Sequence, residues 1–393
     1  MMIPRPPPPS LRVALRAGWS SIVVSPSSCI PATHRAHSSS PTTYPALVYD
    51  KYGRHDEILK VAHLPLPPVS ATTVNVKFLA SPINPADINQ LQGTYPLKPP
   101  FNPTIGGAIG GNEGVAEVIS VGDGVRGIHV GDWVIPVASG SGTWRTHAQY
   151  EAEDVLKLES EGVSKIIAAT ISVNPSTAYR MLKDFDNLQP GDVVIQNGAN
   201  SGVGQSVIQL AKAWGFRTVN IVRQRPDLDE LKHQLHALGA DMVITEEDAR
   251  RTDVAAQVKQ LGPPPRLALN CVGGKSATNM VRLLGHDAHL VTYGGMSKEP
   301  VTLPTSAFIF KNLSAHGFWM TRWYDAHSHD DQRARMLSAL LALARTARLR
   351  EPWHDLNSFR AEDPVDRLRE LAVTAIDKAG RGFGSRKQIF EFE

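Results

Sequence analysis

A turn of small residues at positions 197–206 constrains the fold of this chain more than any other feature. It reads Asn-Gly-Ala-Asn-Ser-Gly-Val-Gly-Gln-Ser, follows a short apolar run and leads into the helical pattern of Val203–Trp214. Small residues let a backbone approach a pyrophosphate, and the free N–H groups of a helix start stabilise its charge. In the fingerprint G-x-G-x-x-G the positions are Ala199, Ser201 and Gly204, so only the last matches. The strand, turn and helix context therefore carries the prediction of a dinucleotide site.

The sequence around this turn alternates short apolar strands with longer helical stretches. That alternation is typical of an α/β domain with a parallel sheet and helices on both faces. Right-handed crossovers then predict a doubly wound Rossmann sheet. The expected strands are Asp192–Gln196, Thr218–Val222, Asp241–Thr245, Leu267–Val272 and His289–Tyr293, and the expected helices are Val203–Trp214, Asp227–Leu238, Glu246–Gln260 and Lys275–Leu284.

The preceding part of the chain has a different rhythm, with short β-rich runs interrupted by Gly and Pro. This pattern predicts a compact, mostly antiparallel barrel. Turn glycines between Val121 and Pro136 lie between two valine-rich strands and predict a tight hairpin. The expected strands are Thr73–Phe78, Gly114–Val121, Asp132–Val137 and His147–Tyr150.

The length of 393 residues favours two domains, each with its own core. We expect residues 41–172 to form the catalytic barrel, residues 173–321 the cofactor domain, and residues 322–393 a return to the catalytic domain. For the last part the pattern predicts helices at Asp331–Arg350 and Pro364–Lys378 and a closing strand at Lys387–Phe392.

Residues 1–40 differ sharply in charge from the rest. They contain four arginines, nine serines and no acidic residue. This composition is typical of an organelle transit peptide, because a negative-inside potential pulls cations inward. Arg12 and Arg16 interrupt the best candidate for a secretory apolar core, Leu11–Val24. The segment therefore predicts import into the mitochondrial matrix, and the alternative is a Pro/Ser-rich tail without targeting value.

Composition excludes several classes of protein. Beyond residue 40 the chain has 37 basic and 38 acidic residues, so it lacks the charge excess of a nucleic-acid-binding protein. Only Cys29 and Cys271 occur, which rules out a disulfide framework and a cysteine-rich metal site. No apolar run is long enough to suggest a membrane span. We expect neither nucleic acid nor membrane as a partner.

The charge after the second strand of the sheet indicates which cofactor is bound. Sites for NAD place an acid about 20 residues beyond the glycine turn. Here Arg223, Gln224 and Arg225 stand at that place. An acid would repel a 2′-phosphate, whereas the two arginines can pair with it. The sequence predicts NADPH, and the alternative is that both arginines are merely solvated in a loop.

Six further stretches form a specific set. They resemble the medium-chain dehydrogenase/reductase superfamily, in which a GroES-like β-barrel and a Rossmann sheet enclose a cleft. Over residues 45–393 the resemblance is closer to the mitochondrial 2-enoyl thioester reductases, which are NADPH-dependent enzymes of mitochondrial fatty-acid synthesis. The six stretches are residues 83–96, 110–114, 142–146, 173–179, 293–296 and 317–320.

The resemblance also shows one departure within the superfamily. Its alcohol dehydrogenases carry a zinc-binding Gly-His-Glu, whereas this chain has Gly111, Asn112 and Glu113. No cysteine lies between Cys29 and Cys271. Imidazole and thiolate ligands are thus both missing, and we expect no metal.

The resemblance implies reduction of a trans-2-enoyl thioester, with hydride added to C3 and a proton to C2. It places the proton donor at Tyr95, a phenol that stays protonated at neutral pH. Without the resemblance, Tyr95 before Pro96 would read as a packing residue of a loop. A quinone oxidoreductase-like NADPH reductase and a non-catalytic NADPH-binding protein are the competing interpretations.

The same resemblance implies a set of cofactor residues. Asn174 would meet the nicotinamide ribose, although it could simply cap a helix. Phe318 and Trp319 could be ordinary core, Lys387 a surface charge, and Trp319 with Trp323 part of an acyl-chain pocket. The full set is Asn174, Asn200, Ser201, Gly202, Val203, Arg223, Gln224, Arg225, Tyr293, Gly294, Gly295, Met296, Phe318, Trp319, Met320 and Lys387.

The resemblance finally implies partners. The enoyl chain is expected on acyl carrier protein, an acidic protein, with coenzyme A esters as the alternative carrier. Basic residues are candidates for docking it, although they could be generic surface charge. A homodimer formed through edge strands of the cofactor sheet is also expected. The docking candidates are Lys311, Arg322, Arg381 and Arg386.

Overall fold

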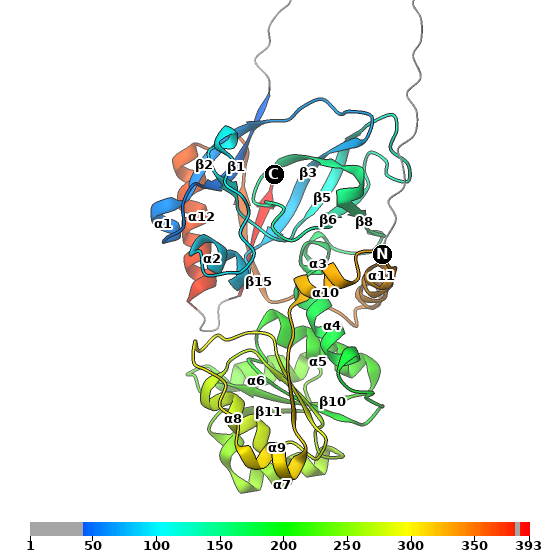
Figure 1. Cartoon of the computed structure of the whole chain (residues 1–393), viewed down its shortest axis with the longest axis vertical. Helices are drawn as coiled ribbons and strands as arrows, with labels where there is room; N and C mark the ends of the chain where they lie inside the picture. The colour runs from blue at the N-terminus through cyan, green and yellow to red at the C-terminus, as the bar shows by residue number, and fades with distance from the viewer. Residues whose placement is uncertain (1–41, 382–385) are drawn as a thin grey trace, which may run out of the picture. The chain divides into compact units, whose positions relative to one another are not determined.

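The computed structural model describes residues 42–381 and 386–393, which contain two large sheets (Figure 1). The predicted transit peptide lies outside the described residues. Among the helices of the described part, none is both long and apolar enough to cross a bilayer. The predicted α/β class is confirmed, with one mostly antiparallel part and one parallel sheet.

The first sheet has seven strands, with the order β15-β16-β3-β5-β6-β8 and β7 paired to β3. A smaller sheet with the order β2-β1-β4 accompanies it. All pairs are antiparallel except β15 with β16. The strands are β1 (Thr43–Tyr49), β2 (Lys60–Pro65), β3 (Thr73–Pro82), β4 (Ala108–Ile109), β5 (Val115–Val121), β6 (Trp133–Pro136), β7 (His147–Glu151), β8 (Val155–Lys157), β15 (His354–Phe359) and β16 (Lys387–Phe392).

Strand β3 is the centre of the first sheet. Val74, Val76 and Phe78 alternate along it with polar residues, so one face of the strand is apolar. All three are fully buried in one core cluster, to which β16 contributes Phe390 and Phe392. Strand β16, near the C-terminus, therefore packs into the same core as β3.

The predicted tight hairpin is wrong. Strands β5 and β6 do pair, with Ala116 opposite Val134, but residues 122–132 separate them. This connection is held elsewhere, because the N–H groups of Gly122 and Gly124 donate to the carbonyls of Thr73 and Ala71. Backbone bonds to the start of β3 therefore replace the turn that the glycines suggested.

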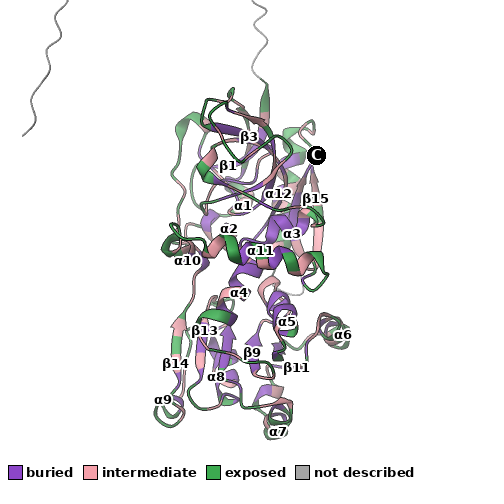
Figure 2. Cartoon of the chain, turned by 90° about the vertical axis from the view of Figure 1, so that its right-hand side faces the viewer, coloured by how far each residue is buried: buried purple, intermediate pink, exposed green. Residues whose placement is uncertain are grey.

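The second sheet is six-stranded, parallel and doubly wound, with the order β11-β10-β9-β12-β13-β14. Strand β9 is buried along its whole length (Figure 2), as expected for a strand covered on both faces. The strands are β9 (Val193–Asn197), β10 (Arg217–Val222), β11 (Met242–Thr245), β12 (Leu267–Asn270), β13 (His289–Thr292) and β14 (Ser314–Gly317).

Two local predictions in this sheet need correction. The helix expected over Glu246–Gln260 begins only at Thr252, because Arg251 is extended. Arg251 bonds Asp253, and Asp248 accepts the backbone N–H of Thr245, so local polar contacts and a short 3₁₀ turn replace the first part of the predicted α-helix. Strand β14 was not expected, since Ser-Ala-His-Gly has no apolar run and pairs only because it lies beside β13.

Helices cover the sheets and connect them. The helix predicted over Asp331–Arg350 ends at Arg345, where the chain turns through Ala347 at a positive φ of 54°. The helices are α1 (His55–Ile58), α2 (Pro85–Leu91), α3 (Lys165–Thr170), α4 (Asn174–Asp184), α5 (Gly202–Trp214), α6 (Leu228–Leu238), α7 (Thr252–Leu261), α8 (Gly274–Arg282), α9 (Thr305–Lys311), α10 (Met320–Ala326), α11 (Gln332–Arg345) and α12 (Val365–Gly380), with 3₁₀ turns η1 (Pro103–Ile105), η2 (Ala152–Asp154) and η3 (Asp248–Arg250).

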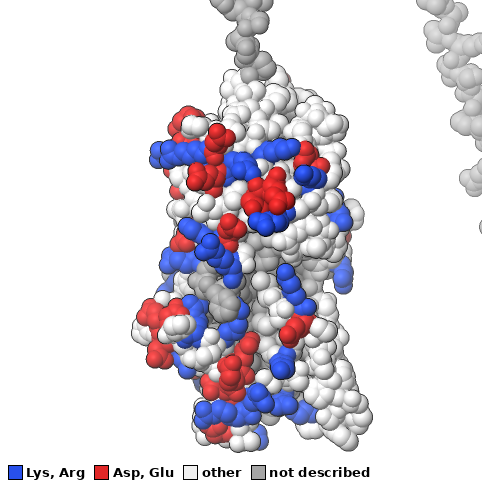
Figure 3. Space-filling view, turned by 90° about the vertical axis from the view of Figure 1, so that its left-hand side faces the viewer, with Lys and Arg blue, Asp and Glu red and all other residues white. Residues whose placement is uncertain are grey.

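The two sheets share one compact unit of chain. After α11 the chain bonds to α5, where the N–H groups of Arg350 and Trp353 donate to Gln209 and Gln205. It then enters β15 and joins the first sheet. On the face shown in Figure 3, basic and acidic side chains are interspersed. The predicted domain boundaries stay predictions, and the one at residues 321/322 lies inside α10.

Candidate functional site

Most of the predicted cofactor residues follow the carboxyl ends of parallel strands. In doubly wound sheets the ligand crevice lies outside these ends. The structure therefore brings segments distant in sequence to one edge of the second sheet. Asn200 to Val203 follow β9, Arg223 to Arg225 follow β10, Tyr293 to Met296 follow β13, and Phe318 to Met320 follow β14.

The turn after β9 has the geometry of a phosphate cradle. Ser201 is the N-cap of α5, and its hydroxyl accepts the N–H of Gly204 at 3.1 Å. A Cβ on Gly204 would lie 2.5 Å from the carbonyl oxygen of Ala199, so no larger residue fits. The turn thus needs glycine at the one position where the fingerprint matches. The small turn and the start of the long helix α5 fit a bound pyrophosphate.

Asn174 lies beside this turn. It is the first residue of α4 and is buried. A Cβ on Gly202 would come within 2.6 Å of its amide nitrogen, so the side chain packs directly on the glycine. The residue predicted to meet the nicotinamide ribose and the residues predicted to hold the pyrophosphate are therefore neighbours.

The two arginines after β10 differ in how far they are buried. Arg223 and Gln224 are exposed, whereas Arg225 is half-buried. Two nitrogens of the Arg225 guanidinium, Nε and Nη2, donate to the carboxylate of Asp227, each at 2.5 Å. A 2′-phosphate at this end of the strand would meet the free face of a guanidinium that its own loop already orients.

The loop that carries Tyr95 is tied to helix α2. Gly93 follows the helix with a positive φ of 72°, and a Cβ there would lie 2.7 Å from the ring of Tyr52. The N–H groups of Thr94 and Tyr95 both donate to the carbonyl of Asn89. Because the backbone at Thr94 and Tyr95 is hydrogen-bonded to a residue of α2, the position of the phenol depends on the position of that helix.

Tyr95 contacts the second sheet through Trp319. The indole Nε1–H donates to the phenolic oxygen at 2.8 Å, and the two rings meet edge to face with centroids 6.0 Å apart. Burial raises the pKa of Tyr95, and the hydrogen bond from Trp319 opposes that rise. The phenol is therefore neutral at pH 7 and is oriented from the end of β14.

A buried polar network lies at the start of α2. The Glu113 carboxylate accepts the amide N–H of Asn84 at 2.7 Å and the backbone N–H of Val173 at 3.0 Å. Asp87 accepts the backbone N–H of Asn84 at 2.6 Å. The ammonium of Lys387 donates to the side-chain oxygen of Asn84. Lys387, predicted to reach the cofactor, thus belongs to this network.

The charges of the network are strongly perturbed. Burial raises the pKa of Asp87 to about 6 and also raises the pKa of Glu113, which the ammonium of Lys387 and the amide of Asn84 oppose. Burial also lowers the pKa of Lys387, which the nearby carboxylates oppose. Two buried acids face one buried amine, so the opposite charges stabilise one another where burial disfavours each of them.

Asn112 occupies the place where the alcohol dehydrogenases carry histidine. Its amide nitrogen donates to Asp87 and to Gln90, each at 2.6 Å. Gln90 in turn donates to the carbonyl of Leu97, just beyond Tyr95. Across residues 42–381 and 386–393, no group of three or more His, Cys, Asp and Glu side chains could hold a metal ion. Asn112 supports the loop of the phenol.

The segment after β13 contains a buried phenol as well. Burial raises the pKa of Tyr293, and its side chain lies against Cys271 and Ser201. Burial also raises the pKa of the Cys271 thiol to about 11, which makes it a poor nucleophile. Gly294 and Gly295 follow Tyr293, and Met296 is exposed. Met320, by contrast, is buried in the main core.

Sequence reasoning missed the network of Asn84, Asp87, Gln90 and Glu113. All four are polar and buried. The only available signal was that they fall within stretches 83–96 and 110–114, which the family resemblance had already selected. Their partners, Val173 and Lys387, lie in other parts of the chain.

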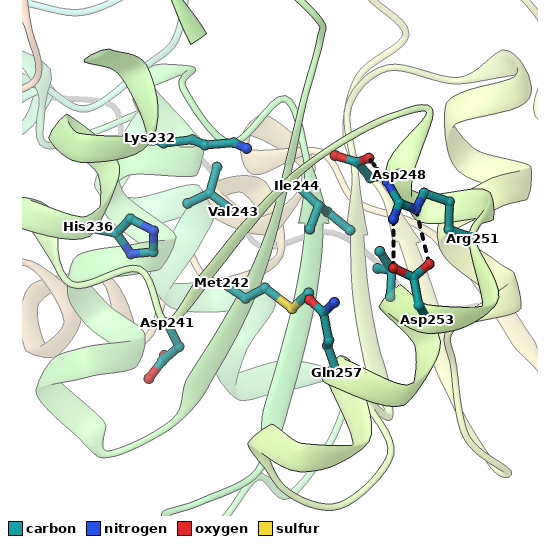
Figure 4. Close-up of a pocket in the computed structure, with 11 residues that line it drawn as sticks. Lys232, His236, Asp241, Met242, Val243, Ile244, Asp248, Arg251, Asp253 and Gln257 are labelled. Carbon is teal, nitrogen blue, oxygen red and sulfur yellow. Dashed lines mark hydrogen bonds and ion pairs between the residues drawn. The ribbon is translucent and has the colours of Figure 1, made fainter. Parts of the chain in front are cut away.

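A pocket with a volume of about 330 Å³ lies elsewhere, at the edge strand β11 (Figure 4). None of the predicted site residues lines it. Three of its charged groups are paired with each other, since Arg251 bonds Asp253 at 2.7 Å and lies 3.6 Å from Asp248. We assign no function to it.

Comparison with known proteins agrees with this geometry. Residues 202–336 match the family described as zinc-binding dehydrogenase, and residues 70–169 match the alcohol dehydrogenase GroES-like domain. The chain is 48% identical over 321 residues to the mitochondrial enoyl-[acyl-carrier-protein] reductase of Homo sapiens, covering 82% of this chain and 84% of the relative. It is 49% identical over 356 residues to that of Rattus norvegicus, covering 89% of each. The chain belongs to the mitochondrial enoyl-[acyl-carrier-protein] reductase family.

Solved structures extend this result to the reductase fold. The mitochondrial 2-enoyl thioester reductase Etr1p/Etr2p heterodimer from Candida tropicalis matches with a TM-score of 0.83 and 38% identity, covering 89% of this chain and 99% of that one. A complex of Etr1p with NADP and crotonyl-CoA matches with a TM-score of 0.82 and 37% identity, with the same coverage. A quinone reductase from Bacillus thuringiensis, at 24% identity and a TM-score of 0.74, shares the fold alone.

The relatives also bear on location. The reductases of Homo sapiens and Rattus norvegicus are mitochondrial by name, which confirms the mitochondrial location predicted for this reductase. The transit peptide itself stays a prediction. The predicted roles of individual site residues likewise stay predictions.

Proposed function

We propose that this reductase transfers a hydride from NADPH to C3 of a trans-2-enoyl thioester while Tyr95 protonates C2. The single observation that carries the proposal is the hydrogen bond from Trp319 to Tyr95. It holds a neutral phenol at the carboxyl ends of the parallel strands. The relatives reduce enoyl-[acyl-carrier-protein] by name, and one was solved with NADP and crotonyl-CoA.

The residues present fit this cofactor. Asn200 to Val203 would hold the pyrophosphate at the start of α5. Arg223, Gln224 and Arg225 would hold the 2′-phosphate, and Asn174 the nicotinamide ribose. The segments from Tyr293 to Met296 and from Phe318 to Trp319 would line the nicotinamide. The bound cofactor supplies the hydride, and the protein supplies geometry and the proton.

The proton balance is simple. The hydride forms the new C3–H bond, and the electron pair of the double bond moves toward the thioester oxygen. C2 then takes the proton of the Tyr95 hydroxyl, and water reprotonates the phenolate. Because the Trp319 N–H occupies an acceptor lone pair of the phenolic oxygen, the O–H stays available for donation. The same bond stabilises the phenolate that remains.

The reaction class can be tested by following NADPH absorbance with crotonyl-CoA. We expect turnover with the thioester and none with quinones. Tyr95→Phe should lower kcat by at least about a hundredfold while the affinity for NADPH stays unchanged. Turnover of quinones at rates equal to those of the thioester would favour the quinone reductase instead, and NADPH binding without any turnover would favour a non-catalytic protein.

Cofactor choice has a separate test. Arg223→Ala combined with Arg225→Ala should raise KM for NADPH at least about tenfold and leave KM for NADH nearly unchanged, because only NADPH carries the 2′-phosphate. Lys212→Ala is a matched control, since it removes a cation from α5 without changing the end of β10. Equal effects on both cofactors would refute the assignment.

The protein is also proposed to form a homodimer through strand β14 and helix α9. β14 is an edge strand of the sheet. Phe308, Ile309 and Phe310 of α9 are 42%, 67% and 73% exposed, an unusually apolar surface for an unpartnered helix. The neighbour from Candida tropicalis is a heterodimer.

Acyl carrier protein is the proposed carrier of the substrate. Of the four basic candidates, Lys311 donates to the carbonyls of Arg282 and Leu284, and Arg386 pairs with Asp355. Both therefore have structural partners. Arg322 lies 6.0 Å from the ring of Trp319, beside the phenol. Charge reversal at Arg322 and Arg381 should raise KM for the carrier-protein substrate and not for the coenzyme A ester.

A further inference from the structure

Glu113 joins two elements that carry different halves of the site. It is 2% exposed, and its two carboxylate oxygens accept from different partners. One accepts the side-chain amide of Asn84, which precedes α2, and the other accepts the backbone N–H of Val173, which precedes α4. Helix α2 leads to the loop of Tyr95, and α4 begins with Asn174.

We propose that Glu113 is a positioning residue that sets the distance between the phenol of Tyr95 and the nicotinamide end of the cofactor site. The inference rests on the proposed function. It gives a role to a residue that touches neither the phenol nor the phosphate turn. The role follows from one carboxylate holding the start of both helices at once.

The Glu113 carboxylate can serve as a fixed connection between α2 and α4, here called the joint, because the backbone of Glu113 is itself hydrogen-bonded. The carbonyl of Glu113 accepts the hydroxyls of Ser81 at 2.7 Å and Thr143 at 2.8 Å, and these hydroxyls also lie 2.7 Å from each other. All three residues are buried. A side chain anchored in this way transmits the position of α4 to α2 instead of following either helix.

Lys387 extends the joint to the last strand. Its ammonium donates to the oxygen of the Asn84 amide while the nitrogen of that amide donates to Glu113. The orientation of the Asn84 amide is therefore determined from both sides. Strand β16, which begins at Lys387, pairs with β3 and so ties the joint to the centre of the first sheet.

The chemistry of the two oxygens makes the proposal testable. Both neighbours of the carboxylate are donors, so Glu113 must provide two acceptors. Glutamine has the same shape but only one acceptor oxygen, and its amide nitrogen would face either Asn84 or Val173 donor to donor. A buried donor without a partner is costly, and the joint would open on that side.

A second substitution at Asn84 restores the pairing of donors with acceptors around position 113. In the double variant Glu113→Gln with Asn84→Asp, the introduced amide donates to the introduced carboxylate, and its oxygen still accepts from Val173. The introduced carboxylate also accepts from Lys387, and the net charge of the network is unchanged. Asn84→Asp alone places two carboxylates together and should open the joint as Glu113→Gln does.

The experiment measures kcat with NADPH and crotonyl-CoA, the Kd of NADPH by fluorescence, and the midpoint of thermal unfolding for each variant. We expect Glu113→Gln and Asn84→Asp each to lower kcat about tenfold to a hundredfold, because an unpaired buried donor or a like-charge pair displaces the phenol. The Kd of NADPH should change less than about threefold, since the phosphate turn and the end of β10 are untouched. The double variant should recover most of kcat.

Glu117→Gln is the matched control. Glu117 lies on β5, four residues along the chain from Glu113, outside this network. The inference is overturned if Glu113→Gln keeps the kcat of the control, if kcat and NADPH affinity fall in parallel, or if the double variant recovers nothing. Should Glu113→Gln fail to fold, Asn84→Asp and the double variant decide the matter. An inactive wild-type protein would instead refute the proposed function.

Discussion

The indole N–H of Trp319 donates to the phenolic oxygen of Tyr95 across 2.8 Å. The two residues lie 224 positions apart in the chain, one after the last strand of the parallel sheet and the other after α2. This bond orients the proposed proton donor and stabilises its anion. It connects the proposed proton donor to the segment after β14, which is proposed to line the nicotinamide.

Trp319→Phe should lower kcat and shift its pH profile. The variant keeps an aromatic ring at this position and removes the N–H together with the fused five-membered ring. Loss of one hydrogen bond predicts a fall in kcat of about three- to tenfold. Since the bond lowers the pKa of Tyr95, its loss should move the alkaline limb of the kcat profile to higher pH. Initial rates across the pH range check both effects.

Trp214→Phe is the matched control for this measurement. Trp214 ends helix α5 and lies below the ammonium of Lys183 at 4.4 Å, outside the site. The control should leave the alkaline limb in place. An unchanged profile in Trp319→Phe would mean that the indole N–H does not act on the phenol.

Gly204→Ala should weaken NADPH binding. The added methyl would lie 2.5 Å from the carbonyl oxygen of Ala199, a backbone atom that cannot move without deforming the phosphate turn. Such overpacking predicts an increase of at least about tenfold in the Kd of NADPH, measured by fluorescence. Gly380→Ala, which meets only ordinary contact with Ile88 at 3.8 Å, should leave the Kd unchanged. Wild-type affinity in Gly204→Ala would exclude a cofactor at this turn.

Charged substitutions on α9 should separate the proposed dimer. Ile309→Glu combined with Phe310→Glu places two carboxylates on the exposed apolar surface next to β14, where burial on association would cost several kcal/mol. Light scattering after size exclusion should then report the mass of a monomer. Val130→Glu, which changes an exposed valine in the loop before β6, should keep the dimer. A dimer that survives the α9 variant must use another surface.

The acid stability of the protein should depend on His147. Burial, assisted by Lys77, lowers the pKa of His147 from 6.5 to about 4, and the ring stacks on Tyr44 with centroids 3.7 Å apart. The folded state therefore binds fewer protons than the unfolded state between these pH values. The stabilising contribution is present above pH 6.5 and is lost as the pH falls toward about 4.

The variant His147→Gln removes this titration. Its thermal midpoint should fall less between pH 7 and pH 4.5 than the midpoint of the wild type, by about 2 °C or more. His63→Gln is a control, because His63 is an exposed residue of β2, paired with Pro45 of β1 in the smaller sheet. Parallel pH curves for the wild type and His147→Gln would contradict the prediction.

Local sequence patterns predicted much of the parallel sheet. Strands β9 to β13 could be recognised because a strand buried on both faces must be a short apolar run, and helix α5 because it follows a turn of small residues. Strand β14 could not, since Ser314–Gly317 acquires its strand conformation from pairing with β13. The helix expected over Glu246–Gln260 was too long for a related reason, because Arg251 prefers the carboxylates of its own loop.

The candidate site was predictable only in part. The family resemblance named Tyr95, and the strand order placed the cofactor residues at one edge. Neither could reveal that Trp319 bonds Tyr95, or that Glu113 bonds both Asn84 and Val173. A polar residue buried in a network has the same local sequence as one exposed to water, so its role appears only with its partners.

The sequence by itself determined the class of the fold, the turn of small residues after β9 and the position of two arginines after β10, because each depends on residues adjacent in the chain. The tertiary structure alone decided which distant groups meet. It brought a tryptophan of the second sheet to the phenol of the first, and it buried two acids beside one lysine. Short-range steric preferences are encoded locally, whereas hydrogen bonds and desolvation depend on whatever the fold places alongside.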